Sequence, residues 1–257
     1  MSVNALYTDL SGYYDLLCSD VAYAAQSQAV HRLQQLFGNG GTAHLDLACG
    51  TGAHVRHFLD LGYHSSGLDI NQPMLDQAAQ RCPEAQFVLG DMASFSVPAP
   101  QDLITCFLYS MHYNPSVAAL TKCFASVHAA LAAGGVFCFN AVDKEQIDNR
   151  LFATHSLAHQ GSMLTFRSSW YYEGFGEQQA LKLRIEKHAS ENHSPDSHNA
   201  VQTEQWQDEH AMVAVSFAQL TELLSPYFDV HLLAHDYEKI VPCEATAGNA
   251  LLVCVKR

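Results

Sequence analysis

The sequence predicts an α/β protein with a doubly wound, mostly parallel sheet of seven strands and an antiparallel β-layer inserted before its last helix. Between residues 43 and 142, short apolar runs with strand character alternate with helical segments, and right-handed crossovers would place such strands in parallel. A glycine-rich turn follows the first of these runs, at Gly50 and Gly52. Between residues 160 and 215 no helix is expected, and longer segments show partial two-residue alternation, which predicts antiparallel strands.

The first half of the chain is expected to open with a helix over residues 20–37, with Asp20 as its cap and Gly38 beyond its end. Pro73 is typical of a first helical position, and we expect that helix to run to Arg81. The predicted strands are 43–49, 64–70, 85–91, 102–108 and 136–142, and the remaining helices are 52–61 and 116–131, the second closed by Gly134 and Gly135.

The second half contains the inserted layer and the end of the main sheet. Its antiparallel strands are predicted at 162–173, 180–190 and 203–215, with a polar hairpin loop at 191–200. Ser216 and Gln219 form a capping-box pattern that opens a helix to about Leu224, and segments 228–238 and 249–257 are expected to pair as the last two strands. The chain is thus expected to divide into an N-terminal helical lid (1–40), a core (41–160), the β-insertion (161–215) and a completion of the core (216–257).

Composition and charge narrow the classes of function. Of the 257 residues, 48% are hydrophobic and 15% are charged, which is typical of a globular protein. The net charge of −13 argues against nucleic acid and anionic membranes as partners. No apolar run reaches the roughly 18 residues that span a bilayer, and the N-terminus lacks signal-peptide features, so we expect a cytoplasmic protein. Eight cysteines without a CxxC pair predict free buried thiols and no metal site.

The most informative motif is LDLACGTGAH, residues 45–54, in which a buried strand runs into Gly50 and Gly52 and then into a helix. Glycine lets a backbone approach a ligand closely, and a helix N-terminus offers free N–H groups to a carboxylate or phosphate. Two alternatives are a turn that only packs and a dinucleotide site. The dinucleotide fingerprint requires glycine or alanine where this chain has Val55.

Two acidic residues support a nucleoside ligand at this turn. Asp69 ends the second predicted strand, where its carboxylate could accept both ribose hydroxyl protons. Asp91 ends the third, where it could accept a hydrogen bond from an adenine amino group. Carboxyl ends of parallel strands meet at one edge of the sheet, so the turn and both acids are expected around one adenosine. A single aspartate at a strand end is otherwise often a turn or capping residue.

With this pattern the sequence resembles the class I S-adenosylmethionine (SAM)-dependent methyltransferases over about residues 40–142. LDLACGTG is a form of the first motif of that family, with Ala48 in place of its first glycine. The resemblance implies SAM as cofactor and S-adenosylhomocysteine as product. The residues it places around the cofactor are Tyr23, Asp46, Ala48, Gly50, Gly52, Asp69, Ile70, Met74, Asp91, Met92 and Phe107.

The N-terminal stretch LYTDLSGYYDLL further resembles the small-molecule N-methyltransferases, in particular the aminosugar N,N-dimethyltransferases. That resemblance implies an active-site role for Tyr14 and places His112 beside the acceptor nitrogen, although the chain is one residue shorter just before His112. It also implies that Trp170 and Tyr172 of the β-insertion roof the acceptor pocket or form a dimer contact. The alternatives are that Tyr14, Trp170 and Tyr172 pack in the core and that His112 fixes its loop through backbone hydrogen bonds.

We therefore expect a SAM-dependent methyltransferase of a small-molecule amine, acting as a monomer or homodimer. Most alkylamines are protonated at neutral pH, so a base is needed, and His112 is the candidate base with Tyr14 as the positioning group. Holding the amine in line with the S–CH3 bond can supply roughly 7–11 kcal/mol. The alternatives are O- or C-methylation of a small metabolite, a non-catalytic SAM-binding module, and an NAD(P) oxidoreductase, which Val55 and Asp91 disfavour.

Overall fold

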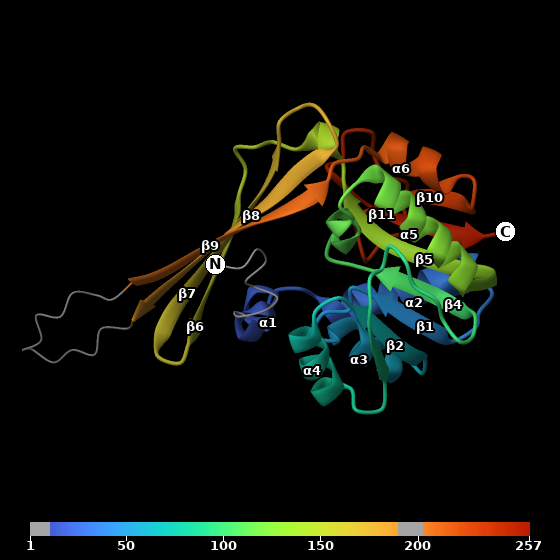
Figure 1. The fold of residues 1–257 in the computed structure, drawn as a ribbon, viewed down its shortest axis with the longest axis horizontal. Helices are drawn as coiled ribbons and strands as arrows, with labels where there is room; N and C mark the ends of the chain where they lie inside the picture. The colour runs from blue at the N-terminus through green and yellow to red at the C-terminus, as the bar shows by residue number, and fades with distance from the viewer. Residues whose placement is uncertain (1–10, 190–202) are drawn as a thin grey trace, which may run out of the picture.

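The computed structural model describes residues 11–189 and 203–257. The first ten residues, which include part of the N-terminal lead-in, lie outside the described residues, as does the predicted hairpin loop at 191–200. Two separate sheets organise the chain, one of seven strands and one of four (Figure 1). The smaller sheet projects away from the larger one, and the short helix α1 (Tyr14–Leu17) lies between them (Figure 1).

The larger sheet is doubly wound, with the strand order β10-β11-β5-β4-β1-β2-β3. Neighbours from β5 to β3 run parallel, whereas β11 is antiparallel to both β5 and β10. This confirms the predicted seven-stranded sheet and its terminal hairpin. The strands are β1 (Ala43–Leu47), β2 (His64–Asp69), β3 (Gln86–Leu89), β4 (Gln101–Cys106), β5 (Leu131–Val142), β10 (Phe228–Ala234) and β11 (Asn249–Lys256).

Helices cover both faces of this sheet. On one face, Phe124 and Leu220 pack with Phe137 and Phe139, and on the other Val30 and its neighbours pack with Val136 and Cys138. Consecutive residues of β5 thus enter opposite cores, as the alternation of side chains along a strand requires. The helices are α2 (Tyr23–Phe37), α3 (Ala53–Asp60), α4 (Gln72–Arg81), α5 (Val117–Ala130) and α6 (Phe217–Leu224).

The smaller sheet is an antiparallel meander in the order β6-β7-β8-β9, formed by β6 (Ala153–His159), β7 (Ser162–Tyr172), β8 (Gln178–Ala189) and β9 (Thr203–Val213). One face packs against α1 and the residue before it, where the half-buried Tyr14 and Tyr13 pack against a cluster that contains Leu164 and Phe166. The sheet therefore holds α1 from one side, while the larger sheet lies on the other (Figure 1).

Several boundaries differ from the sequence-based prediction. Helix α2 begins at Tyr23, and its N-cap is Ala22 rather than Asp20. Strand β5 begins at Leu131, so the segment at Gly134 and Gly135 belongs to the strand and does not close α5. Strand β6 was not predicted, because its residues 153–159 are mostly half-buried or exposed and carry little hydrophobic pattern, and it extends the insertion back to residue 153.

Other local predictions are confirmed. The Ser216–Gln219 capping box is formed at the start of α6, and Pro73 lies in the first turn of α4. Within the described residues, none of the helices has the length and apolar character needed to cross a membrane.

Candidate active site

The glycine turn links β1 to α3 and has an unusual backbone. Ala48, Gly50 and Gly52 all have positive φ, at 53°, 53° and 78°. Ala48 therefore adopts a left-handed conformation that costs an L-residue with a Cβ about 1–2 kcal/mol. This tight turn directs the backbone of residues 48–50 toward the carboxyl end of the sheet, where Ala48 and Gly50 line a pocket.

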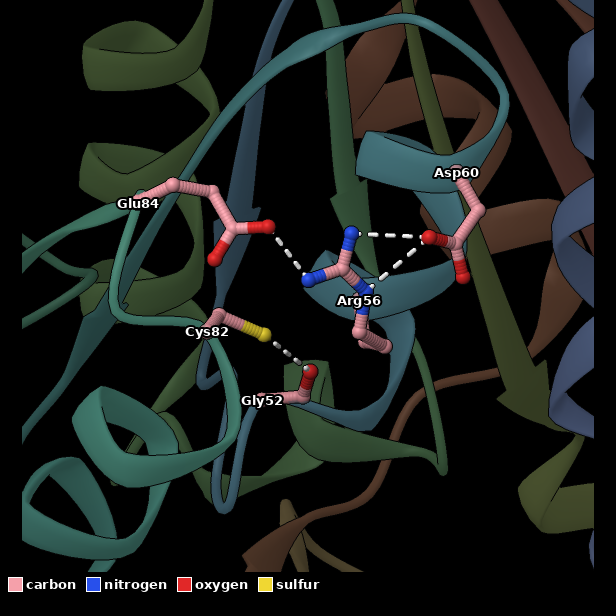
Figure 2. Close-up of polar contacts among 5 residues, drawn as sticks. All are labelled: Gly52, Arg56, Asp60, Cys82 and Glu84. Atoms are coloured by element: carbon pink, nitrogen blue, oxygen red, sulfur yellow. Dashed lines mark hydrogen bonds and ion pairs between the residues drawn. The ribbon is translucent and has the colours of Figure 1, made fainter.

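Gly52 serves packing rather than the pocket. A Cβ at Gly52 would lie 3.0 Å from the Cβ of Ala78, so the bare backbone lets α4 approach α3 closely. Behind the turn, the thiol of Cys82 lies 3.7 Å from the Gly52 carbonyl oxygen, and Arg56 bridges Asp60 and Glu84 (Figure 2). The resemblance placed Gly52 at the cofactor, but Gly52 does not line the pocket described below.

Asp69 is the central acid of the site. Its side chain is buried, and its carboxylate accepts hydrogen bonds from the backbone N–H of Gly50 (2.9 Å) and of Asn71 (2.8 Å). Burial raises the pKa of Asp69, and these N–H donors act in the opposite direction. Each oxygen of an ionised carboxylate can accept more than one hydrogen bond, so Asp69 can also receive ligand hydroxyls.

Asp69, Asp91 and the glycine turn surround one pocket. Asp91 is exposed at its edge, and its carboxylate accepts a hydrogen bond from the N–H of Ala93 at 2.8 Å. Two sides can be distinguished: a glycine-loop side, formed by Ala48, Gly50, Asp69 and Asp91, and a tyrosine side, formed by Tyr14, Ser110 and Tyr113. The full lining comprises Tyr14, Ala48, Gly50, Leu68, Asp69, Ile70, Asn71, Met74, Gly90, Asp91, Met92, Leu108, Ser110 and Tyr113.

This pocket fits an adenosine group. Ile70 is 65% exposed beside the two acids, although it is a large apolar side chain, and a bound adenine ring would cover it. Met74 and Met92 add polarisable apolar surface to the same lining. An apolar slot with a few fixed hydrogen-bonding groups is typical of a nucleoside site.

A smaller recess adjoins the pocket and shares Tyr14 and Ala48 with it. Three further residues that the resemblance assigned to the cofactor, Tyr23, Asp46 and Phe107, line this recess. Burial raises the pKa of Asp46 to about 7, against the effect of the hydrogen bond that it accepts from the Thr105 hydroxyl at 2.6 Å. A cationic ligand group in the recess would favour the ionised form of Asp46.

The position of Tyr14 is fixed by a polar cluster that the sequence analysis missed. Asp15 accepts a hydrogen bond from the Thr51 hydroxyl at 2.6 Å and forms an ion pair with Arg81. Arg81 also donates to the carbonyl oxygen of Thr51 at 2.7 Å. These contacts join α1 to the glycine turn and to α4, and they hold Tyr14 over Gly50. The YYD sequence gave no signal of this cluster, because its partners lie far along the chain.

The geometry of His112 does not support the predicted role as a base. Its Nδ1 lies 2.9 Å from the carbonyl oxygen of Val213, and its Nε2 accepts the N–H of Val142 at 3.0 Å. Burial lowers the pKa of His112 to about 4. The side chain is 1% exposed and does not line the pocket, so these contacts favour the alternative that His112 fixes its loop to β5 and β9.

The two aromatic residues assigned to the acceptor also lie away from the pocket lining. Trp170 packs edge-on against Tyr109 and His112, with ring centroids 5.6 and 5.9 Å apart. The Tyr172 hydroxyl donates to the carbonyl oxygen of Gly176 at 3.2 Å within its own turn. The Trp170 contacts are of the packing kind that was the alternative for this residue, whereas the Tyr172 hydrogen bond lies in an exposed turn.

Two residues of the tyrosine side were not predicted. Ser110 and Tyr113 lie in the short 3-10 helix η3 (Ser110–Tyr113) after β4, and Tyr113 contacts His210 of β9 through its hydroxyl. The motif CFLYSMHYNPS drew attention to this loop, but only the structure separates Tyr113, which faces the pocket, from His112, which faces the interior.

Residues 45–135 match the family model described as a methyltransferase domain. The chain is similar to curated methyltransferases over about half of its length. It is 33% identical over 127 residues to the dTDP-4-amino-2,3,4,6-tetradeoxy-D-glucose N,N-dimethyltransferase of Saccharopolyspora spinosa, covering 49% of this chain and 50% of that relative. The chain therefore spans about half the length of the curated relatives it matches.

Solved structures of similar proteins extend the likeness to the whole fold. The crystal structure of Streptomyces venezuelae DesVI matches with a TM-score of 0.80 and 22% identity, covering 97% of this chain and 99% of that one. The SAM-bound structure of CalS10, an amino pentose methyltransferase from Micromonospora echinaspora, matches with a TM-score of 0.78 and 17% identity over 97% of both chains. At these identities the likeness shows the fold, including the four-stranded insertion.

Proposed function

We propose that this chain is a SAM-dependent N-methyltransferase whose acceptor is the amine of a small molecule, with nucleotide-linked aminosugars as the substrate class. The observation that carries the proposal is the single pocket that brings Gly50, Asp69 and Asp91 together and continues to the hydroxyls of the tyrosine side. The matched region of the Saccharopolyspora spinosa aminosugar dimethyltransferase supports the choice of acceptor.

In this proposal the bound SAM supplies an electrophilic methyl group, and the residues of the chain bind and orient the reactants. Asp69 accepts hydrogen bonds from the ribose hydroxyls, and Asp91 lies at the adenine end of the pocket. Tyr14, held over Gly50 by the Asp15 cluster, covers the junction between the pocket and the recess. Exclusion of water by these side chains keeps the methyl group from hydrolysis.

The test combines binding and product analysis on the full chain. Calorimetry is expected to show binding of SAM and S-adenosylhomocysteine and no binding of NADH. Incubation of SAM with dTDP-4-amino-2,3,4,6-tetradeoxy-D-glucose is expected to add one or two methyl groups to the amine, detected by mass spectrometry. A product methylated on oxygen or carbon would show that the chain is an O- or C-methyltransferase instead. If the chain binds SAM but methylates none of a panel of aminosugars, carboxylates and phenols, it is a SAM-binding module.

Three further features belong to the same proposal. The net charge of −13 disfavours a nucleic-acid acceptor and fits a cytoplasmic enzyme of small metabolites. The division into lid, core and insertion fits a binding site between α1 and the two sheets. A monomer or homodimer is proposed, and light scattering of the purified chain would distinguish the two.

A further inference from the structure

Three side chains from two different parts of the fold form a chain of polar contacts that ends at the pocket. The hydroxyl of Tyr113, on η3, contacts Nδ1 of His210, on β9. Nε2 of His210 in turn lies 3.1 Å from a carboxylate oxygen of Asp208 on the same strand. Tyr113 lines the tyrosine side of the pocket, whereas His210 is completely buried behind it.

We propose that Tyr113, His210 and Asp208 form a proton relay that accepts the proton released by the acceptor amine. The inference rests on the proposed function and deepens it, because it identifies the base that N-methylation needs and that His112 is not placed to supply. Tyr113 is the catalytic residue, since it faces the pocket, and His210 and Asp208 act through it as positioning residues.

The position of Asp208 favours one direction for the relay. Its carboxylate oxygen lies 3.1 Å from Nε2 of His210, which favours the tautomer with the proton on Nε2 and makes Nδ1 the acceptor. In that tautomer Nδ1 accepts the hydroxyl proton of Tyr113, and the Tyr113 oxygen can accept a proton from a donor in the pocket. Burial lowers the pKa of His210, with Asp208 acting in the opposite direction, so the resting ring is neutral at pH 7.

The strand geometry explains why the acid and the histidine can act together. Residues 208 and 210 are two apart on β9, so their side chains leave the same face of the sheet. The uncharged Leu181 and Trp170 lie in register with His210 on β8 and β7. The titratable groups that contact His210 include Asp208 on β9 and Tyr113 on η3. The acid stabilises an imidazolium at His210 without competing for Tyr113.

The protonated amine first gives a proton to the oxygen of Tyr113, and the hydroxyl proton of Tyr113 moves to Nδ1 of His210. The nitrogen then uses the electron pair freed in this way to form a bond to the methyl carbon, while the carbon–sulfur bond breaks and sulfur keeps the electron pair of that bond. The net result is one proton on His210, whose positive charge lies beside Asp208, and this proton is later lost to solvent. Two such cycles would give a dimethylated amine.

The decisive experiment is the pH dependence of kcat for Tyr113→Phe and His210→Gln with saturating SAM and dTDP-4-amino-2,3,4,6-tetradeoxy-D-glucose. Each variant is expected to lose at least about 100-fold in kcat at pH 7, the lower range for general acid–base catalysis. The loss should shrink about tenfold per pH unit toward the amine's own pKa, because the free base no longer needs a proton acceptor. A merely structural role would give a loss that does not change with pH.

Two further variants sharpen this result. Asp208→Asn is expected to lower kcat by about tenfold and to move the acid limb of the profile to lower pH, since the carboxylate no longer stabilises the protonated ring. Tyr109→Phe is the matched control, because it also removes a tyrosine hydroxyl from the loop after β4. The Tyr109 hydroxyl accepts a hydrogen bond from Asn249 at 3.1 Å, and Tyr109 does not line the pocket. Its kcat and pH profile should equal those of the wild type.

The outcomes separate this inference from the proposed function. Failure of the wild type to bind SAM would reject the function itself, whereas wild-type pH profiles in Tyr113→Phe and His210→Gln would reject the relay alone. Nitrogen-correlated NMR of His210 in the chain saturated with S-adenosylhomocysteine needs no acceptor, with His210→Gln to assign the signal. A neutral ring protonated on Nε2 is expected at pH 7, and a ring protonated on Nδ1 would overturn the relay, because it could not accept from Tyr113.

Discussion

The glycine-loop side and the tyrosine side of the pocket are built in different ways. The first comes from residues 48–91, a continuous run in which each ligand-facing group lies at or just beyond the end of a strand of the parallel sheet. The second brings together α1, η3 and, behind Tyr113, strand β9, which are separated by about a hundred residues at each step. One side thus depends on local backbone geometry, and the other depends on how the smaller sheet docks on the larger one. Substitutions on the glycine-loop side should therefore change ligand binding, whereas substitutions on the tyrosine side should change the docking of the two sheets and the stability of the fold.

The largest effect is expected where the two sheets meet, at His112. His112→Ala should lower the free energy of unfolding by about 3–4 kcal/mol, because it leaves the buried Val142 N–H and Val213 carbonyl without their partner and creates a cavity. Urea unfolding measures this loss. An unchanged stability together with lost turnover and retained SAM binding would instead restore His112 as a catalytic base and break the comparison.

Acidification should act on the same group. Burial lowers the pKa of His112 to about 4, from 6.5 in the unfolded chain. Between these two pH values the unfolded state binds a proton at His112 that the folded state does not bind. The free energy of unfolding should therefore fall as the pH decreases from 6.5 toward 4. His44 and His54, whose pKa values burial lowers to about 3, add to this effect, and Asp46, raised to about 7, opposes it. Equilibrium unfolding at several pH values should show a shallower dependence in His112→Ala.

On the glycine-loop side the expected effect is on binding. Asp69→Ala should weaken SAM binding by about 1.5–3 kcal/mol, through loss of a charge-assisted hydrogen bond and of the contact that holds the Gly50 N–H. Calorimetry of the variant is the measurement. Asp76→Ala removes an exposed acid of neighbouring α4 and serves as the control. Equal affinities of wild type and Asp69→Ala would contradict the ribose role.

A smaller effect is expected where α1 joins the two sides. Asp15→Asn weakens the contact with Arg81, whose side chain is 32% exposed, and ion pairs of this exposure contribute about 0.2–1 kcal/mol. The KM for SAM should rise roughly two- to fivefold with little change in stability. Asp60→Asn, which removes the exposed partner of Arg56 on α3, should leave the KM unchanged (Figure 2). A KM that Asp15→Asn does not alter would mean that α1 stays over the turn without this cluster.

The smallest effect concerns the backbone of the turn. Ala48→Gly should stabilise the chain by about 0.5–1 kcal/mol, because glycine adopts the left-handed conformation found at residue 48 without strain. Ala53→Gly, in the first turn of α3, should destabilise it by a similar amount. Thermal unfolding of both variants tests the sign, and a destabilised Ala48→Gly would show that this alanine is not strained.

These contrasts also explain what the sequence could predict. Strand order, the turn and the positions of Asp69 and Asp91 follow from short patterns, because strand ends and glycine spacing are local properties. The sequence could not distinguish His112 from Tyr113, since adjacent residues of a 3-10 helix face different surroundings that only the docked β9 defines. For the same reason the partners of Asp15 and His210 had no local signature, and weakly patterned β6 was missed.

The bonds between η3 and the smaller sheet restrict how this protein can be re-engineered. The Val213 carbonyl oxygen contacts His112, His210 contacts the Tyr113 hydroxyl, and Gln178 donates to the Pro115 carbonyl oxygen at 3.1 Å. Three polar contacts therefore connect the insertion to the loop that follows β4. A chimera that grafts residues 153–213 from a relative to change acceptor preference would replace the side chains of His210 and Gln178 and the strand that positions the Val213 carbonyl. Transplanting η3 together with the insertion, as one cassette, is the exchange that this architecture permits.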